Sequence, residues 1–314
     1  MIGSRSDSIK DHPGLAVRCA AAISPAVIFG AERGNIDLFI FALMVLGVAA
    51  CCRQPPALRL AGYLLVTAAA MLKFYPAAAL VLVLREKLRL MLVCAATLAI
   101  LACLYLVLYA GGTVTAIRTL PGGPPFGYWF GASNAAIGTA LLLLSPGINL
   151  DPDIAAYRAV LDSGRVFQMA KTGIFIMEIA ALALAIRIAA RRPYAEPASA
   201  QHAFMLAGAA ILCVCFFAAQ NVVYREVYAL MILPALSGQR HWLEAGIIAL
   251  LWEEALRRVV ASFATGLFGI SHGAWIEIGF WVLRETLWWW VIIELGAILV
   301  SFMRRRAVEL SAAA

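Results

Sequence analysis

Three short polar segments interrupt long apolar stretches of this chain, and they carry side chains that can bind an anion or move a proton. They are residues 32–37 (ERGNID), 73–76 (KFYP) and 221–226 (NVVYRE). Ionisable groups beside membrane-like sequence are energetically costly and are usually functional. These segments are therefore the candidate site.

The side chains of these segments suit one kind of reaction. Arg33, Lys73 and Arg225 could hold an anionic phosphate. Glu32, Asp37 or Glu226 could accept a proton, and we take Asp37 and Glu32 as the catalytic candidates. When a sugar leaves a lipid-linked phosphate, the phosphate gains charge, and fixed cations stabilise that charge. The pattern therefore predicts transfer of a sugar from a lipid phosphate.

The composition indicates a helical membrane protein. Of the 314 residues, 63% are hydrophobic and 14% are charged, whereas soluble domains have about 25% charged residues. We therefore expect an all-α, polytopic transmembrane protein with about 8–10 membrane segments, some short or re-entrant. The net charge of +7 comes from basic residues between apolar runs, and no basic-aromatic patch predicts a nucleic-acid partner.

Apolar runs define the expected segments. They fall at residues 14–31, 36–52, 60–72, 74–84, 88–110, 134–148, 166–190, 203–220, 226–237, 242–256 and 275–303. Several are shorter than the ~20 residues of a simple span, and short segments line cavities more often than they face lipid. We expect one transmembrane domain, 1–314, with a polar N-terminal tail (1–13), an extracytoplasmic loop region (111–165) and a cytoplasmic tail (304–314).

Basic residues predict which helix ends share a side of the membrane. If the basic groups near residues 53–59, 85–89, 187–192 and 304–306 are all cytoplasmic, residues 60–84 must leave and return to one side. Pro76 supplies the break, because proline cannot continue a helix. This hairpin places Lys73 on the same outer face as Asp37. A single span over 60–84 is the alternative.

Each candidate residue also has a structural interpretation. The alternatives are an N-cap for Asn35 or Asp37, head-group anchoring for Arg33, snorkelling for Lys73, an interfacial belt for Tyr75, and a local ion pair within 224–226. Asn134 could be a simple turn or cap residue. The spacing of Glu253, Glu254, Arg257 and Arg258 is that of ion pairs along one helix, so we interpret these four as structural.

No motif predicts a resident cofactor. The 7 cysteines and 4 histidines do not have zinc-site spacing, and there is no Walker A or GxGxxG motif. We expect a polyprenyl-phosphate sugar as donor substrate. Whether a divalent metal ion also takes part stays open, because one or two carboxylates can hold such an ion together with a phosphate.

Together, "ERGNID", "LKFYP" and "NVVYREVYALMILPAL" resemble polyprenyl- or dolichyl-phosphate-sugar-dependent GT-C glycosyltransferases. The likeness is greatest to the bacterial family 87 group, which includes mycobacterial mannosyl- and arabinofuranosyltransferases, and it covers roughly residues 24–236. It implies a GT-C fold with inverting transfer on the extracytoplasmic face of the bacterial inner membrane. The substrate-binding positions that it implies are Arg33, Asn35, Lys73, Tyr75, Asn221, Tyr224 and Arg225.

One feature departs from the family pattern. GT-C enzymes typically carry a catalytic aspartate or glutamate in the outer loop after their first transmembrane helix, but only 32 residues precede Arg33 here. The resemblance therefore implies an N-terminally truncated member, a degenerate one, or one whose base comes from elsewhere. Asp7 and Asp11 are not assigned to this role.

The expected function is a multi-pass membrane glycosyltransferase of the cell envelope. It would move a hexose or pentose, mannose-like or arabinose-like, from polyprenyl phosphate to a glycolipid or polysaccharide acceptor, with membrane lipids as further partners. The alternatives are a transporter or flippase of lipid-linked sugars and an inactive homologue with a structural role. Transport predicts polar residues at both faces, so their gathering on one face favours the enzyme.

Overall fold

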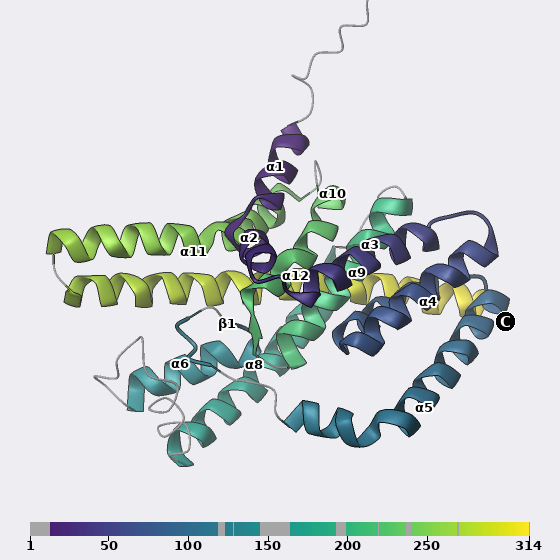
Figure 1. The fold of residues 1–314 in the computed structure, drawn as a ribbon, viewed down its shortest axis with the longest axis horizontal. Coiled ribbons are helices and arrows are strands. Elements are labelled where there is room, and N and C mark those ends of the chain that lie inside the picture. Colours follow the sequence, from purple (N-terminus) through teal and green to yellow (C-terminus); the bar gives the residue numbers. More distant parts are fainter. Residues whose placement is uncertain are drawn as a thin grey trace, which may run out of the picture.

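A computed structural model describes residues 13–118, 123–127, 129–144, 164–192, 199–218, 220–236, 240–268 and 270–313. The described chain is almost wholly helical, and its one strand pair joins β1 (Trp129–Phe130) to β2 (Asn221–Val222) (Figure 1). The all-α class is therefore confirmed. Most of the predicted tail 1–13, with Asp7 and Asp11, and part of the predicted loop region 111–165 lie outside the described residues.

The described helices have the following bounds, in chain order. They are α1 (Pro13–Ala22), α2 (Pro25–Glu32), α3 (Ile36–Cys51), α4 (Pro56–Leu72), the 3-10 helix η2 (Tyr75–Arg85), α5 (Leu88–Arg118), α6 (Ala132–Leu144), α8 (Gly164–Arg191), α9 (Ser199–Ala218), the 3-10 helix η3 (Val223–Met231), α10 (Leu233–Leu236), α11 (His241–Phe268) and α12 (Ile270–Ala313). Helix α6 lies inside the predicted loop region, where the apolar run 134–148 supports it.

Five described helical stretches are long and apolar enough to cross a membrane. They are Leu15–Glu32, Leu88–Gly112, Gly164–Arg191, Ala200–Ala218 and Trp275–Ala312. Helices α3, α4, η2 and α6 are apolar but shorter. This pattern suggests a membrane protein, and the expected number of 8–10 segments stays a prediction.

Helix α9 lies at the centre of the fold, and α5 lies at its edge. Helix α9 contacts α3, η2, η3 and α12, and small residues such as Ala203 and Ala207 let these neighbours approach closely. Figure 1 shows α5 at the edge of the molecule, and its Val107 is 80% exposed. In a bilayer, lipid would cover such an apolar face.

The hairpin predicted for residues 60–84 is confirmed. Helix α4 ends at Leu72, and η2 returns beside it from Tyr75. The Tyr63 hydroxyl donates hydrogen bonds to the Leu82 carbonyl oxygen at 3.1 Å and to Glu86 Oε1 at 2.9 Å. Arg59 Nε lies 3.3 Å from Glu86 Oε2. The two ends of the hairpin therefore meet at one end of the fold.

The contacts of α12 place the basic segments near residues 187–192 and 304–306 at the same end of the fold as Arg59 and Glu86. Arg306 donates to the carbonyl oxygens of Leu84 and Glu86, and the late residues of α8 pack beside Ala297. Trp281, in contrast, clusters with the first turns of α8. The 25 residues of α12 from Trp281 to Arg306 rise about 37 Å, more than the ~30 Å of a hydrocarbon core.

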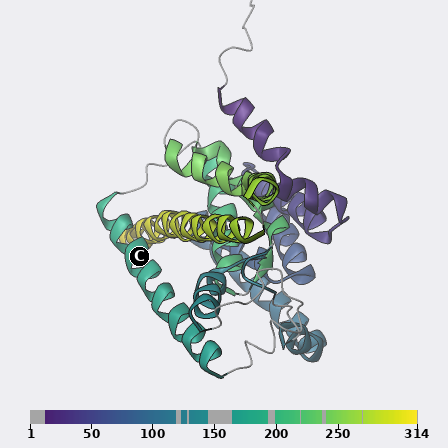
Figure 2. The ribbon, with the colours of Figure 1, turned by 90° about the vertical axis from the view of Figure 1, so that its left-hand side faces the viewer.

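After α9 the chain packs back against the fold as η3 and α10, and then continues as the long helix α11. Helices η3 and α10 pack against α9. Arg240 Nη1 then lies 2.6 Å from Glu294 Oε2, about midway between Trp281 and Arg306 along α12. From there α11 runs antiparallel to α12, and the two helices lie side by side in Figures 1 and 2. The short apolar runs 226–237 and 242–256 belong to this returning segment.

Candidate functional site

The turn between α2 and α3 places Asp37 at the start of a helix. Gly34 has a φ of +55°, which favours glycine because a side chain is strained there. Asn35 then caps α3, since its Oδ1 accepts a hydrogen bond from the Asp37 backbone N–H at 2.9 Å. The N-cap interpretation of Asn35 is confirmed. Asp37 lies in the first turn, where the helix dipole favours a carboxylate.

The Asp37 carboxylate does more than stabilise this helix start. It is 1% exposed, and its Oδ2 lies 2.7 Å from Lys73 Nζ. The Tyr75 hydroxyl donates to its Oδ1. Arg225 Nε lies 3.9 Å from Oδ2. We call Asp37, Lys73, Tyr75 and Arg225 the cationic cluster.

The hairpin tip explains why Lys73 and Tyr75 reach Asp37. Lys73 ends α4 with an extended backbone (φ −150°, ψ 144°), and Pro76 sits in the first turn of η2. The chain therefore turns between the two helices, and both side chains meet the start of α3. Lys73 is held by an ion pair here rather than by snorkelling alone.

Tyr228 belongs to the same group, although the sequence analysis did not single it out. Its hydroxyl donates to the Tyr75 hydroxyl at 3.3 Å, and the two rings meet edge to face at 5.5 Å. The Arg225 guanidinium lies 4.9 Å from the centre of the Tyr75 ring. Because a 3-10 helix repeats every three residues, Arg225 and Tyr228 share a face of η3.

The cationic cluster has more donors than its own acceptors use. Two cations face one carboxylate, and the side chains of Lys73 and Arg225 are 26% and 17% exposed. Arg225 Nε is buried, and no acceptor among the described residues takes its hydrogen bond. Lysine and arginine donors arranged in this way suit an oxyanion such as a phosphate.

Aromatic rings join this cluster to Arg33. The Tyr224 ring centre lies 6.0 Å from Lys73 Nζ, and the ring stacks on Phe29 at 6.5 Å. The Arg33 guanidinium lies 5.1 Å from the Phe29 ring centre. Tyr224 therefore borders the cationic cluster, and Arg33 lies beyond the rings of Tyr224 and Phe29. Asn221 begins β2, but the structure does not describe its side chain, so its substrate-binding role stays a prediction.

A pocket of about 440 Å³ lies between α2, η3 and α11. We call it the acidic pocket, and its polar lining consists of Glu32, Arg33, Glu226, Glu253, Glu254 and Arg258. Glu226 is 2% exposed and forms no hydrogen bond or ion pair with any residue that the structure describes. Arg225 pairs with Asp37 instead, so the proposed local ion pair within 224–226 does not form.

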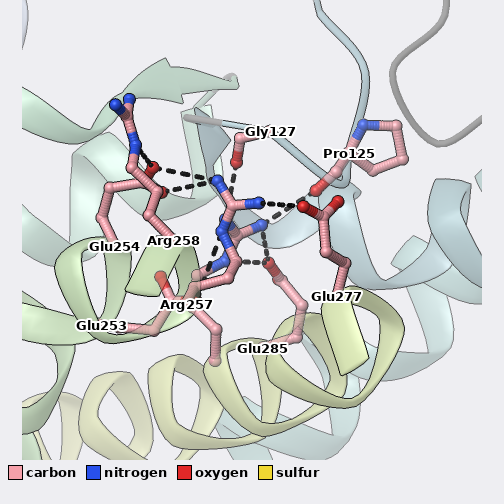
Figure 3. A network of polar contacts seen from close by, with 9 residues as sticks. Pro125, Gly127, Glu253, Glu254, Arg257, Arg258, Glu277 and Glu285 are labelled. Atoms are coloured by element: carbon pink, nitrogen blue, oxygen red, sulfur yellow. Dashed lines mark hydrogen bonds and ion pairs between the residues drawn. The ribbon is translucent and has the colours of Figure 1, made fainter. Parts of the chain in front are cut away.

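An ion-pair network borders the acidic pocket (Figure 3). Arg257 lies 2.9 Å from Glu254 and 3.4 Å from Glu277 of α12, and Arg258 lies 2.6 Å from Glu254. The predicted ion pairs along α11 form, and the network extends to a second helix. Arg284 of α12 donates to the carbonyl oxygens of Pro125 and Gly127. These contacts hold α11, α12 and the segment 123–127 together.

Asn134 also has a structural role. Its side chain is buried, donates to the Trp129 carbonyl oxygen at 2.6 Å and accepts from Gln220 at 2.7 Å. Asn134 thereby joins the segment before α6 to the segment after α9.

Comparisons with known proteins do not indicate a function, so the argument for function rests on the side chains described above. The chain matches no protein family, no curated protein and no solved structure. Among the described residues, no three His, Cys, Asp or Glu side chains are grouped to hold a metal ion. The structure thus defines a helical protein with apolar helices of membrane-spanning length and a cationic cluster beside an acidic pocket.

Proposed function

We propose that this protein is a membrane glycosyltransferase of the GT-C type. It would transfer a hexose or pentose from a polyprenyl phosphate to a lipid or polysaccharide acceptor on the extracytoplasmic face of a bacterial inner membrane. The observation that carries the proposal is the cationic cluster. Lys73 and Arg225, which are 152 residues apart in the chain, meet at one buried carboxylate with donors to spare.

The cluster matches the charge that the reaction develops. Cleavage of the glycosidic bond leaves the electron pair on the phosphate of the lipid carrier, and that phosphate needs fixed cations beside it. Lys73 and Arg225 supply these cations, and Arg33 lies farther away, beyond the rings of Tyr224 and Phe29. The cluster lies at the end of the helices opposite Arg59 and Arg306, a level that suits a head group at the membrane surface.

We assign Asp37 a positioning role. The sequence marks it and Glu32 as candidate bases, but both Asp37 oxygens are engaged, by Lys73 and by Tyr75. A buried aspartate in these contacts fixes the two donors and offsets part of their charge. The proton acceptor then has to be another carboxyl, and Glu32 and Glu226 both line the acidic pocket.

The test is a transfer assay with the purified protein in lipid. Polyprenyl phosphates that carry labelled mannose or arabinose are supplied, and the label is followed into acceptor lipids. Lys73→Ala and Arg225→Ala should each reduce transfer about 10²–10³-fold, because each removes a donor to the leaving phosphate. Lys171→Ala, at an exposed lysine of α8, is the matched control and should leave transfer unchanged. Full transfer by a folded Lys73→Ala variant would exclude the phosphate role.

Transport of lipid-linked sugars is the second candidate. It is favoured by one observation, the buried Glu86 at the opposite end of the fold, which contacts Tyr63 and Arg59. Transport predicts polar groups at both ends of a pathway. Proteoliposomes that move a labelled lipid-linked sugar across the bilayer without transferring it would support this candidate against the enzyme.

A further inference from the structure

The acidic pocket holds features that phosphate binding does not explain. It lies between α2, η3 and α11, and it combines charged groups with an apolar wall that includes Phe29, Leu250 and Leu251. Its carboxyls would repel the phosphate that the cationic cluster attracts. A ligand other than the donor phosphate therefore has to explain the lining of this pocket.

Two of its carboxyls lack hydrogen-bond donors. Glu226 is almost fully buried and has no partner among the described residues. Glu253 Oε1 is buried without a hydrogen bond, and Arg257 Nε lies 3.9 Å from it. Buried polar groups without partners are costly, so native proteins nearly always satisfy them. The lining therefore points to a ligand that brings its own O–H or N–H donors.

The rest of the lining favours hydroxyl groups over an ammonium ion. Arg33 also lines the pocket, and its donors need acceptors that an ammonium group lacks. A hydroxyl both donates and accepts. The face of a sugar ring carries C–H groups that suit Phe29 and the leucines, while its hydroxyls suit the charged edge.

We propose that the acidic pocket binds the hydroxyl-rich head group of the glycosyl acceptor, and that Glu226 accepts the proton of the attacking hydroxyl. This inference rests on the proposed glycosyltransferase function. The acceptor O–H bond breaks and its proton passes to the Glu226 carboxylate. The oxygen forms a bond to the anomeric carbon, the bond from that carbon to the phosphate oxygen breaks, and its electron pair leaves on the phosphate beside Lys73 and Arg225.

The charges around Glu226 set its pH dependence. Burial raises the pKa of Glu226 well above its usual range, Arg284 of α12 opposes this, and Glu253 and Glu254 of α11 and Glu285 of α12 add to it. Glu32 and Arg33 face the same pocket from α2. The carboxylate is the form that accepts a proton, so transfer should rise as pH increases through this raised pKa.

The first test measures binding to the purified protein in lipid nanodiscs. The probes are hexyl mannoside and hexylammonium, which share a tail and differ in head group. We expect saturable binding of hexyl mannoside that is about tenfold weaker in Glu226→Gln, in which a charged acceptor becomes a neutral amide. Ala255→Trp, which fills the pocket from α11 and keeps Glu226, should abolish binding. Glu309→Gln, at an exposed glutamate near the chain end, is the matched control.

The second test measures transfer. Glu226→Gln should lower it about 10²–10⁴-fold and remove the rise with pH, while binding of the polyprenyl-phosphate donor stays unchanged. Tighter binding of hexylammonium than of hexyl mannoside, or full transfer by Glu226→Gln, would overturn the inference and leave the proposed function standing. If the wild-type protein binds no donor, the proposed function fails. Whatever the donor result, absence of saturable hexyl mannoside binding would overturn the assignment of the acidic pocket to the acceptor.

Discussion

The Tyr75 hydroxyl connects Asp37 to Tyr228 at the centre of the site. We predict that Tyr75→Phe lowers the free energy of unfolding by about 1–3 kcal/mol, because a buried carboxylate loses one of its donors. The measurement is reversible unfolding in mixed micelles, with Asp37 and Lys73 left unchanged.

Tyr228→Phe is the control for this effect. It removes only the longer bond of 3.3 Å between two neutral hydroxyls, so it should cost less than Tyr75→Phe. The ring contact of 5.5 Å stays in both variants. An equal cost for the two variants would mean that ring packing, and not the bond to Asp37, stabilises this region.

Glu226 should make stability depend on pH. Its pKa is raised in the folded state by burial, so the folded protein keeps a proton that the unfolded chain releases above its ordinary value of 4.5. The stability that this difference contributes is present below that value and is lost as pH rises. We predict that Glu226→Gln stabilises the protein relative to wild type increasingly toward pH 8.

The measurement is a series of melting temperatures from pH 4 to pH 8 for both proteins. The two curves should converge at the acid end, where Glu226 is protonated in the folded and the unfolded state alike. A constant difference across the range would mean that the substitution acts through packing and not through the charge of Glu226.

Much of the cationic cluster could be anticipated from residue types alone. Charged residues in apolar surroundings have to pair, which is why Asp37, Lys73 and Arg225 come together from separate segments. The sequence could not show that Asp37 uses both oxygens in these contacts. It also did not single out Tyr228, which lies just beyond the polar segment 221–226.

Helices α3 and α4 hold Asp37 and Lys73 at a fixed separation through close packing. A Cβ on Gly62 would lie 2.6 Å from the Gly47 carbonyl oxygen and 2.7 Å from the Cys51 backbone nitrogen. Backbone atoms cannot move aside as a flexible side chain does. We predict that Gly62→Ala forces the helices apart, costs about 1–3 kcal/mol of stability, and lowers transfer.

Gly112→Ala is the matched control for this prediction. Gly112 lies in α5, and a Cβ there would meet nothing within 4 Å. Alanine favours a helix over glycine by about 0.5–1 kcal/mol, so this change should be neutral or stabilising. Thermal melting and the transfer assay apply to both variants. Unchanged transfer in Gly62→Ala would show that the spacing of α3 and α4 does not control the site.

At the level of elements, proline and charge were the informative signals. Pro76 together with the flanking basic residues predicted the hairpin of α4 and η2, and the contact of Arg59 with Glu86 follows from it. Hydrophobic runs located the helices but not their type, since η2 and η3 are 3-10 helices. Helix α11 continues past its apolar run 242–256, and Arg257 in this continuation pairs with Glu277 of α12.

Across the whole molecule, two groups of charges lie at opposite ends, with the Arg240–Glu294 ion pair between them. The cationic cluster and the acidic pocket lie toward one end, and Arg59, Glu86 and Arg306 lie toward the other. The length of α12 from Trp281 to Arg306, about 37 Å, is enough to cross the ~30 Å hydrocarbon core of a bilayer. A lipid-linked donor would thus place its phosphate at the cluster while its chain stays among the apolar helices.

This arrangement predicts opposite sidedness for two exposed lysines. Lys171 lies in the first turns of α8, at the level of Trp281, whereas Lys87 follows Glu86 at the level of Arg306. An amine reagent that cannot cross membranes should label Lys171 from the outer side of intact cells and should label Lys87 only in inverted vesicles. Mass spectrometry of the labelled peptides measures both sites without any substitution.

Detergent-solubilised protein is the control, because both lysines should react once the bilayer is removed. Labelling of both residues from one side of a sealed membrane would contradict the arrangement. Labelling of Lys87 alone from outside would mean that the protein has the opposite orientation in the membrane, with the cationic cluster on the cytoplasmic side. This result would therefore also exclude the proposal that transfer takes place on the extracytoplasmic face.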